Sequence, residues 1–231
     1  MIEFNGVTKT YKKTFTAVKD ISLKIDKGEF VFIVGKSGAG KSTLIKLLLR
    51  EISPSSGIIT YKGTDINKIR KRRVAEYRRN IGFIFQDYRL LPKMTVYENI
   101  AFAMEMICCQ AKQIRREVPL VLSMVGLSDK AKSYPDELSG GEQQRVAIAR
   151  AVINKPETII ADEPTGNLDF ETSKEIMKIL TEINKRGTTV IMATHDREIV
   201  DNYQKRVIEL KNGTILRDIK AGGNENEPKE N

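Results

Sequence analysis

The stretch at 35–42, Gly-Lys-Ser-Gly-Ala-Gly-Lys-Ser, constrains this chain more than any other feature of its sequence. It follows an apolar run at 30–34 that predicts a buried strand, and it precedes an apolar-rich run at 43–49 that predicts a helix. A G-x-x-x-x-G-K-[ST] spacing requires this strand–loop–helix context. Such a loop turns backbone N–H groups toward phosphate oxygens at a helix N-terminus. Lys41 would then reach the terminal phosphates, and the Ser42 hydroxyl would ligate Mg²⁺.

The alternative is a glycine-rich turn that binds nothing. It is disfavoured because every fixed position of the spacing is filled in the required context. The residues predicted to surround the phosphates of ATP are Gly35, Lys36, Ser37, Gly38, Ala39, Gly40, Lys41, Ser42 and Thr43.

Length and composition predict one α/β domain at 1–220, because the chain has 231 residues of which 40% are hydrophobic. The segment 221–231 lacks an apolar anchor and predicts a disordered tail. The formal net charge of +9 permits polyphosphate ligands, nucleic acid or an anionic membrane as partners. Adjacent Cys108 and Cys109 favour reduced thiols in the cytosol, since a vicinal disulfide is strained. No apolar run approaches the length of a membrane span, so a membrane role would require a partner.

Apolar patterning predicts the order of the elements. The first part, 2–34, is β-rich, and further strands are expected at 57–61, 81–85, 158–161 and 188–193. Helices are expected at 140–153 and 170–185, and an inserted helical subdomain at about 87–137, with breaks at Pro92, Pro119 and Pro135. Asn212-Gly213 predicts a type I′ hairpin turn between 207–210 and 214–216.

Four of the predicted strands end in residues suited to ATP chemistry: the phosphate loop, Gln86, Asp162-Glu163 and His195. Ligands of an open parallel sheet lie beyond the carboxyl ends of its strands, so these groups are expected to converge. Asp162 offers a carboxylate to Mg²⁺, and Glu163 can act as general base for a water. Gln86 can orient that water and contact the metal, and His195 can hydrogen-bond a γ-phosphate. A solvated Asp-Glu turn and a structural histidine are the alternatives, and both are disfavoured by position at a strand end.

A second anion site is predicted at 138–145, Leu-Ser-Gly-Gly-Glu-Gln-Gln-Arg. Ser139 and Glu142 have capping-box spacing, and Gly140 and Gly141 would expose N–H groups at the helix start. The segment could be only a well-capped helix. One nucleotide does not need two phosphate sites in one domain, whereas two copies related by a two-fold axis do. Each phosphate loop would then face the Ser139 segment of the other copy across an ATP.

With these motifs assembled, nearly the whole chain resembles the ABC ATPase family. In that resemblance the phosphate loop is Walker A, Gln86 the Q-loop, Leu138–Arg145 the signature segment and 159–163 Walker B. Asp169 lies in the D-loop, and His195 is the switch histidine. Tyr11 resembles the aromatic residue that stacks on adenine, although an ordinary strand-edge tyrosine is an alternative. The family implies a P-loop NTPase core with an N-terminal antiparallel β-subdomain and an inserted α-helical subdomain.

Looser segments, such as 85–92 and 95–103, are most similar to the FtsE branch of the family. This similarity implies ATP and Mg²⁺ as cofactors, an ATP-dependent homodimer, a membrane partner of the FtsX type and a place on the cytoplasmic face of the membrane. Nucleic acid is not expected as a partner. A LolD- or MacB-like transporter subunit is the alternative. A soluble ABC protein acting on DNA or ribosomes is a further alternative. It is disfavoured because such proteins usually carry a long coiled coil or two ATPase domains, and neither pattern is seen here. A simple P-loop kinase is disfavoured because it would lack the signature segment.

The stretch 68–79 is strongly basic. It could contact nucleic acid or anionic lipid, but a run of charge is usually a solvated face. Apolar residues of the helical insert are expected to form its core, and some could contact a partner helix.

Overall fold

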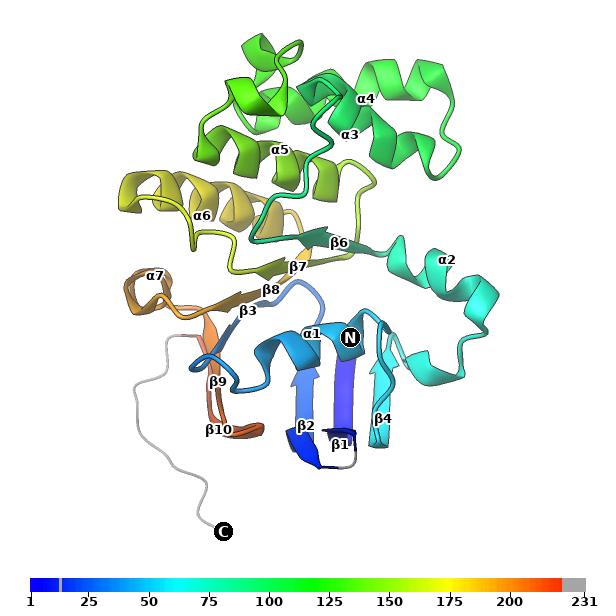
Figure 1. Ribbon diagram of the computed structural model, residues 1–231, viewed down its shortest axis with the longest axis vertical. Coiled ribbons are helices and arrows are strands. Elements are labelled where there is room, and N and C mark those ends of the chain that lie inside the picture. The colour runs from blue at the N-terminus through cyan, green and yellow to red at the C-terminus, as the bar shows by residue number, and fades with distance from the viewer. Residues whose placement is uncertain (13, 222–231) are drawn as a thin grey trace. The chain divides into compact units, whose positions relative to one another are not determined.

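The computed structural model describes residues 1–12 and 14–221, and its chain forms two compact units (Figure 1). Unit 1 is Met1–Arg78 together with the chain from Thr189 onward, and unit 2 is Arg79–Thr188. Apart from Ala221, the predicted disordered tail lies outside the described residues. The single domain predicted at 1–220 therefore remains a prediction.

Unit 1 begins with an antiparallel sheet in the strand order β2-β1-β4-β5. Alternate side chains of these strands, such as Ile21, Leu23 and Ile25, are buried, which is the period-two pattern of a sheet with one covered face. The predicted antiparallel β-subdomain is thereby confirmed. The strands are β1 (Ile2–Tyr11), β2 (Phe15–Ile25), β4 (Ser56–Tyr61) and β5 (Thr64–Asp65).

Unit 1 also contains parallel strands, because β3 (Phe30–Val34) pairs with both β8 (Thr189–Thr194) and β9 (Arg206–Lys211). Every residue of β8 is buried, as expected for a strand covered on both faces. β9 and β10 (Thr214–Ile219) form the predicted hairpin, and the φ angles of Asn212 (50°) and Gly213 (81°) are both positive, as a type I′ turn requires.

The remaining elements of unit 1 are short. They are the helices α1 (Lys41–Leu48), α2 (Val74–Arg78) and α7 (Arg197–Tyr203) and the 3₁₀ turns at Ile66–Lys68 and Lys71–Arg73. The sequence patterns predicted α1 but not α2 or α7. Those two helices span only five and seven residues, too few to show a helical period.

Unit 2 contains the parallel pair β6 (Ile81–Ile84) and β7 (Thr158–Asp162). Its helices are α3 (Val96–Glu105), α4 (Ala111–Met124), α5 (Gly140–Val152) and α6 (Phe170–Lys185), and 3₁₀ turns lie at Ser128–Lys130 and Pro135–Glu137. Apolar faces of α3, α4 and α5 share one core, to which Ile100, Val118 and Val146 contribute fully buried side chains. The predicted elements of this unit are confirmed to within a few residues at their ends.

The predicted helix break at Pro119 is wrong, because α4 continues through this residue. A proline inside a helix removes one backbone hydrogen bond and crowds the carbonyl one turn before it. Here the neighbouring Val118 and Leu122 are buried in the helical core, and this packing accompanies a continuous helix.

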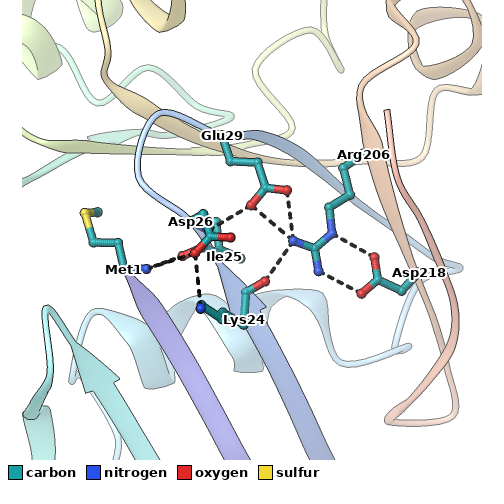
Figure 2. Close-up of polar contacts among 7 residues, drawn as sticks. All are labelled: Met1, Lys24, Ile25, Asp26, Glu29, Arg206 and Asp218. Atoms are coloured by element: carbon teal, nitrogen blue, oxygen red, sulfur yellow. Dashed lines mark hydrogen bonds and ion pairs between the residues drawn. The ribbon is translucent and has the colours of Figure 1, made fainter. Parts of the chain in front are cut away.

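A network of charged groups joins the start of β3 to the β9–β10 hairpin within unit 1 (Figure 2). The Arg206 guanidinium donates to both carboxylate oxygens of Asp218, at 2.7 and 2.8 Å, to Glu29 at 2.9 Å and to the Lys24 carbonyl at 2.8 Å. Its side chain is only 12% exposed, and the hydrogen bonds with Asp218 raise the pKa of Arg206. Three chain segments distant in sequence are thus fastened by one planar side chain.

We expect Arg206→Leu to lower the free energy of unfolding by about 2–3 kcal/mol, because it leaves the Glu29 and Asp218 carboxylates without their shared partner. Urea denaturation measures the change. Arg73→Leu is the matched control, since the Arg73–Glu76 pair is exposed on both sides and its loss should leave the midpoint unchanged. Equal midpoint shifts for the two variants would contradict the stabilising role of the Arg206 network.

Candidate active site

The phosphate loop lies in unit 1, between β3 and α1. Gly40 is the N-cap of α1 with a φ of 111°, and no side chain caps this helix end. The N–H groups of its first turn are therefore open to an anion, which the helix dipole also favours. Lys41 is buried, and its Nζ donates to the Gly35 carbonyl at 2.6 Å, so the cation lies against the loop that it is expected to serve.

The conformation of this loop depends on close contact with backbone from two other segments. A Cβ on Gly40 would lie 2.7 Å from the Ala17 carbonyl oxygen, so no other residue fits without displacement. The Gly213 N–H of the hairpin turn donates to the Ala39 carbonyl at 3.1 Å, and the Gly213 carbonyl accepts from Lys19 N–H at 2.7 Å. Sequence reasoning missed this support, although the Asn-Gly turn itself was recognisable.

Other predicted residues of unit 1 occupy the positions expected from its strands. Lys36, Ser37, Gly38 and Ser42 are exposed, whereas Ala39 is buried and Thr43 is half-buried. His195 is exposed directly after β8, and the pairing of Val34 with Thr194 places the phosphate loop and His195 at the same edge of the sheet. Tyr11 is half-buried at the end of β1, with Lys9 Nζ 5.4 Å from its ring centroid.

In unit 2 the predicted Gln86 and Glu163 come together. Ile84 pairs with Ala161, so the residues that follow β6 and β7 leave the same edge of this strand pair. A Cβ on Gly166 would lie 3.3 Å from Gln86 Nε2 and 3.4 Å from Glu163 Oε2, and both side chains therefore border this glycine. Glu163 has a φ of 49°, a left-handed conformation that is costly for a residue with a Cβ and is concentrated at functional sites. Asp162 is the last residue of β7.

The Ser139 segment begins α5, as its capping-box spacing predicted. Glu142 N–H donates to Ser139 Oγ at 3.3 Å, and Ser139 N–H donates to Glu142 Oε2 at 2.8 Å. The bonds with Ser139 lower the pKa of the Glu142 carboxyl, which is thereby kept charged and engaged. Ser139 and Gly140 are exposed and Gly141 is buried. The Ser139 hydroxyl therefore caps this 13-residue helix, and Ser139 and Gly140 lie at its exposed start.

The loop after Gln86 is clamped by residues that sequence reasoning missed. Tyr88 and Arg89 are consecutive left-handed residues, with φ of 56° and 48°. Each such residue costs about 1–2 kcal/mol. The Arg150 guanidinium, from α5, donates to both of their carbonyls, and burial lowers its pKa. The Tyr88 hydroxyl reaches Gly140, because a Cβ there would lie 3.2 Å from it. No local sequence pattern could have predicted the Arg150 contacts, because Arg150 lies about sixty residues from Tyr88 and Arg89 in the sequence.

Asp169 has a structural contact in addition to its predicted role at the nucleotide. Its carboxylate caps α6 by accepting from Thr172 N–H at 3.0 Å and Thr172 Oγ1 at 2.6 Å, and these bonds lower its pKa.

Gln144, which is fully buried, donates to the Pro164 carbonyl at 2.7 Å. The Ser139 helix is therefore tied to the segment that follows Glu163.

Among the residues of 1–12 and 14–221, no three His, Cys, Asp or Glu side chains gather into a metal-binding group. Mg²⁺ is commonly bound through one or two carboxylates together with substrate phosphates and waters. The exposed Ser42 hydroxyl and the Asp162 carboxylate are oxygen donors of the type that this mode requires. No helix in the described part of the chain is long and apolar enough to span a bilayer.

Comparison with known proteins gives three concordant results. The family model described as "ABC transporter" matches residues 18–166. Cell division ATP-binding proteins FtsE are 55% identical in Mycobacterium tuberculosis over 96% of this chain and 97% of the relative, and 46% identical in Escherichia coli over 93% and 97%. The solved dimer of the ATP-binding cassette MJ0796 bound to ADP and Pi is 37% identical, with a TM-score of 0.87 over 97% of this chain and 100% of that one. CbiO1 of Clostridium perfringens gives a TM-score of 0.88 at 33% identity, covering 94% and 87%.

The contact around Gly166 generates a prediction. The Cβ added in Gly166→Ala would lie 3.3 Å from Gln86 Nε2, so the Gln86 amide must shift by a few tenths of an ångström beside Glu163. We expect ATP hydrolysis to fall about tenfold, as a small misplacement of catalytic groups typically does. ATP affinity should be unchanged, because the phosphate loop is untouched. Turnover assays and calorimetry measure the two quantities, with Lys178→Ala on the exposed face of α6 as the control that should leave both unchanged. A hydrolysis rate equal to that of the parent would show that Gln86 and Glu163 do not need this spacing.

The clamp on the left-handed turn generates a second prediction. Arg150→Lys keeps a positive charge but cannot hydrogen-bond the Tyr88 and Arg89 carbonyls with a planar fork. The turn should relax, and we expect hydrolysis to fall roughly tenfold with ATP affinity retained. Arg115→Lys, which changes an exposed arginine of α4, is the control and should keep the parent turnover. A turnover rate of Arg150→Lys equal to that of the parent would show that the hydrogen bonds of Arg150 to the Tyr88–Arg89 turn are not needed for hydrolysis.

Proposed function

This chain belongs to the ABC transporter family, and from that membership we propose that it is the ATP-hydrolysing subunit of an FtsE-type complex acting in bacterial cell division. It is an ABC-type ATPase and binds ATP, as its family does. The observation that carries the division role is the 46–55% identity to proteins named FtsE over 93–96% of the chain. Because these relatives carry that name, a role in cell division is favoured over a LolD- or MacB-like role in lipoprotein release or efflux.

The residues of unit 1 bind the nucleotide in this proposal. Open N–H groups at the start of α1 and the cation of Lys41 hold the phosphates, and Tyr11 stacks on the adenine. His195 contacts the γ-phosphate from the end of β8. The exposed Lys36, Ser37 and Gly38 form the rim of the loop. These positions support the assignment because the loop, its cation and His195 belong to adjacent, parallel strands.

Residues of unit 2 carry out the hydrolysis. Glu163 accepts the proton of the attacking water, and Gln86, which borders the same glycine, orients that water. Ser42, Asp162 and Gln86 are the proposed ligands of Mg²⁺, which when bound neutralises charge on the terminal phosphates. Gln86 is a neutral amide, so it can orient the water beside the Glu163 carboxylate without adding a second negative charge.

Two copies are proposed to enclose two ATP molecules, with Ser139, Gly140, Gly141 and Glu142 of each copy facing the nucleotide of the other and Asp169 lying at the same boundary. The exposed helix start at Ser139 and Gly140 supports this arrangement, because a single nucleotide does not need a second phosphate site in the same chain. Dimeric MJ0796 bound to ADP and Pi is similar to this chain. A membrane subunit of the FtsX type would hold the dimer at the cytoplasmic face of the membrane.

The test begins with Glu163→Gln, which keeps the shape of the side chain but cannot accept a proton. We expect hydrolysis to fall about 10²–10⁴-fold, the usual contribution of a general base. ATP binding should survive, because Lys41 and Ser42 are unchanged. The uncleaved nucleotide would then hold two copies together, and light scattering with and without Mg·ATP should detect this dimer. Parent-level hydrolysis would contradict the assigned base.

Adding Ser139→Arg to Glu163→Gln distinguishes the two-copy arrangement from a site within one chain. The bulky side chain should abolish the ATP-dependent dimer while leaving ATP affinity of the monomer within about threefold of the parent. Lys41→Ala is the control for lost binding, because it removes the cation at the phosphates. Loss of monomer binding in the Ser139 variant would mean that the segment serves its own chain.

A further inference from the structure

The polar surface at residues 68–78, which we call the basic arm, has no part in the proposed nucleotide site. Its sequence holds six cations and a single carboxylate, so it supplies much of the formal net charge of +9. The arm comprises the end of one 3₁₀ turn, the 3₁₀ turn Lys71–Arg73 and the short helix α2, and α2 is labelled in Figure 1. It belongs to unit 1.

Half of these cations are already engaged. Lys68 pairs with Asp65 at 3.7 Å, and Arg73 pairs with Glu76 at 3.0 Å. Arg78 donates to the carbonyls of Leu49 at 2.9 Å and Arg50 at 3.2 Å. These contacts hold the arm in place or cancel its charge locally.

The other three cations, Arg70, Lys71 and Arg72, are consecutive and exposed, and their side chains make no hydrogen bond or ion pair within the described part of the chain. Three adjacent positive charges without a carboxylate repel one another. The folded structure does not use them, so their contribution must be sought outside the chain.

The backbone beneath these three residues is fixed rather than loose. Tyr77 is 6% exposed, its hydroxyl donates to the Leu48 carbonyl at 2.6 Å, and its ring packs edge-on against Tyr61 with centroids 5.4 Å apart. Ile66 is fully buried on the other side of the basic run. Arg50 donates to the Asn67 carbonyl at 3.0 Å. The arm therefore presents its charges from a preorganised base, which reduces the ordering cost of binding.

We propose that the basic arm docks on anionic lipid headgroups. Single-stranded nucleic acid is usually held by exposed aromatic side chains together with charge, whereas Tyr77, the aromatic residue of the arm, is buried. A groove-reading helix needs several turns, and α2 has five residues. Charge without a stacking or shape-reading element matches a membrane surface, which attracts Lys and Arg through its potential. The inference rests on the proposed function to the extent that an FtsX-type partner brings unit 1 near a membrane.

The test uses the whole chain without its partner and vesicles of phosphatidylcholine with or without phosphatidylglycerol. The parent should co-sediment with the anionic vesicles at low ionic strength and much less with neutral ones. Arg70→Glu/Lys71→Glu/Arg72→Glu should weaken binding to the anionic vesicles at least about a hundredfold, because loss of the three cations alone accounts for roughly that much and the three new carboxylates add repulsion. Adding salt should weaken parent binding progressively.

A charge-matched control changes three exposed lysines elsewhere, in Lys27→Glu/Lys112→Glu/Lys178→Glu. This variant should bind anionic vesicles within about threefold of the parent. Both triple variants should bind Mg·ATP as the parent does, which shows that they fold and separates failure of this inference from failure of the proposed function. Lipid docking would be overturned if both triple variants lost vesicle binding equally or if the parent did not bind the anionic vesicles. It would also be overturned if a DNA oligonucleotide displaced the parent from the vesicles at a nucleotide concentration below that of the accessible anionic lipid.

Discussion

Close backbone packing around the phosphate loop is the constraint on which unit 1 depends. A Cβ on Gly35 would lie 2.5 Å from the Leu210 carbonyl oxygen, and one on Gly40 would lie 2.7 Å from the Ala17 carbonyl oxygen. The loop can lie between β2 and the β9–β10 hairpin only because these side chains are missing. The Arg206 network fastens the same hairpin to the start of β3, so the element that leads into the loop and the element that supports it are held together.

In unit 2 a missing side chain plays the corresponding role at Gly166. Gln86 and Glu163 approach the same point from two different strands, and the parallel pairing of β6 with β7 brings their backbones to one edge. Glu163 has a left-handed backbone conformation directly after Asp162, the last residue of β7, so the strand conformation ends between these two carboxylates. In the proposed function Asp162 would ligate the metal and Glu163 would accept the proton of the water, so the two adjacent carboxylates would have different roles.

The sequence predicted the parts of this design that depend on local pattern. Glycine spacing located the phosphate loop, Ser139 and Glu142 located the start of α5, and Asn212-Gly213 located the hairpin turn. It could not predict contacts between distant segments. The bond from Gly213 to Ala39 and the two bonds from Arg150 to the Tyr88–Arg89 turn depend on tertiary packing, and so does the continuity of α4 through Pro119.

Unit 2 carries the proposed base and the signature segment on one connected framework. Buried Gln144 ties α5 to the Pro164 carbonyl just after Glu163, and Arg150 and Tyr88 tie the same helix to the loop after Gln86. In the proposed dimer, Glu163 acts on the ATP of its own chain, whereas Ser139 contacts the ATP of the partner. A displacement of the loop after Gln86 would then be transmitted to α5 through direct contacts within unit 2 rather than through a flexible linker. In the proposed dimer, unit 2 of each copy would contact both nucleotides, so the two hydrolysis sites are expected to respond together.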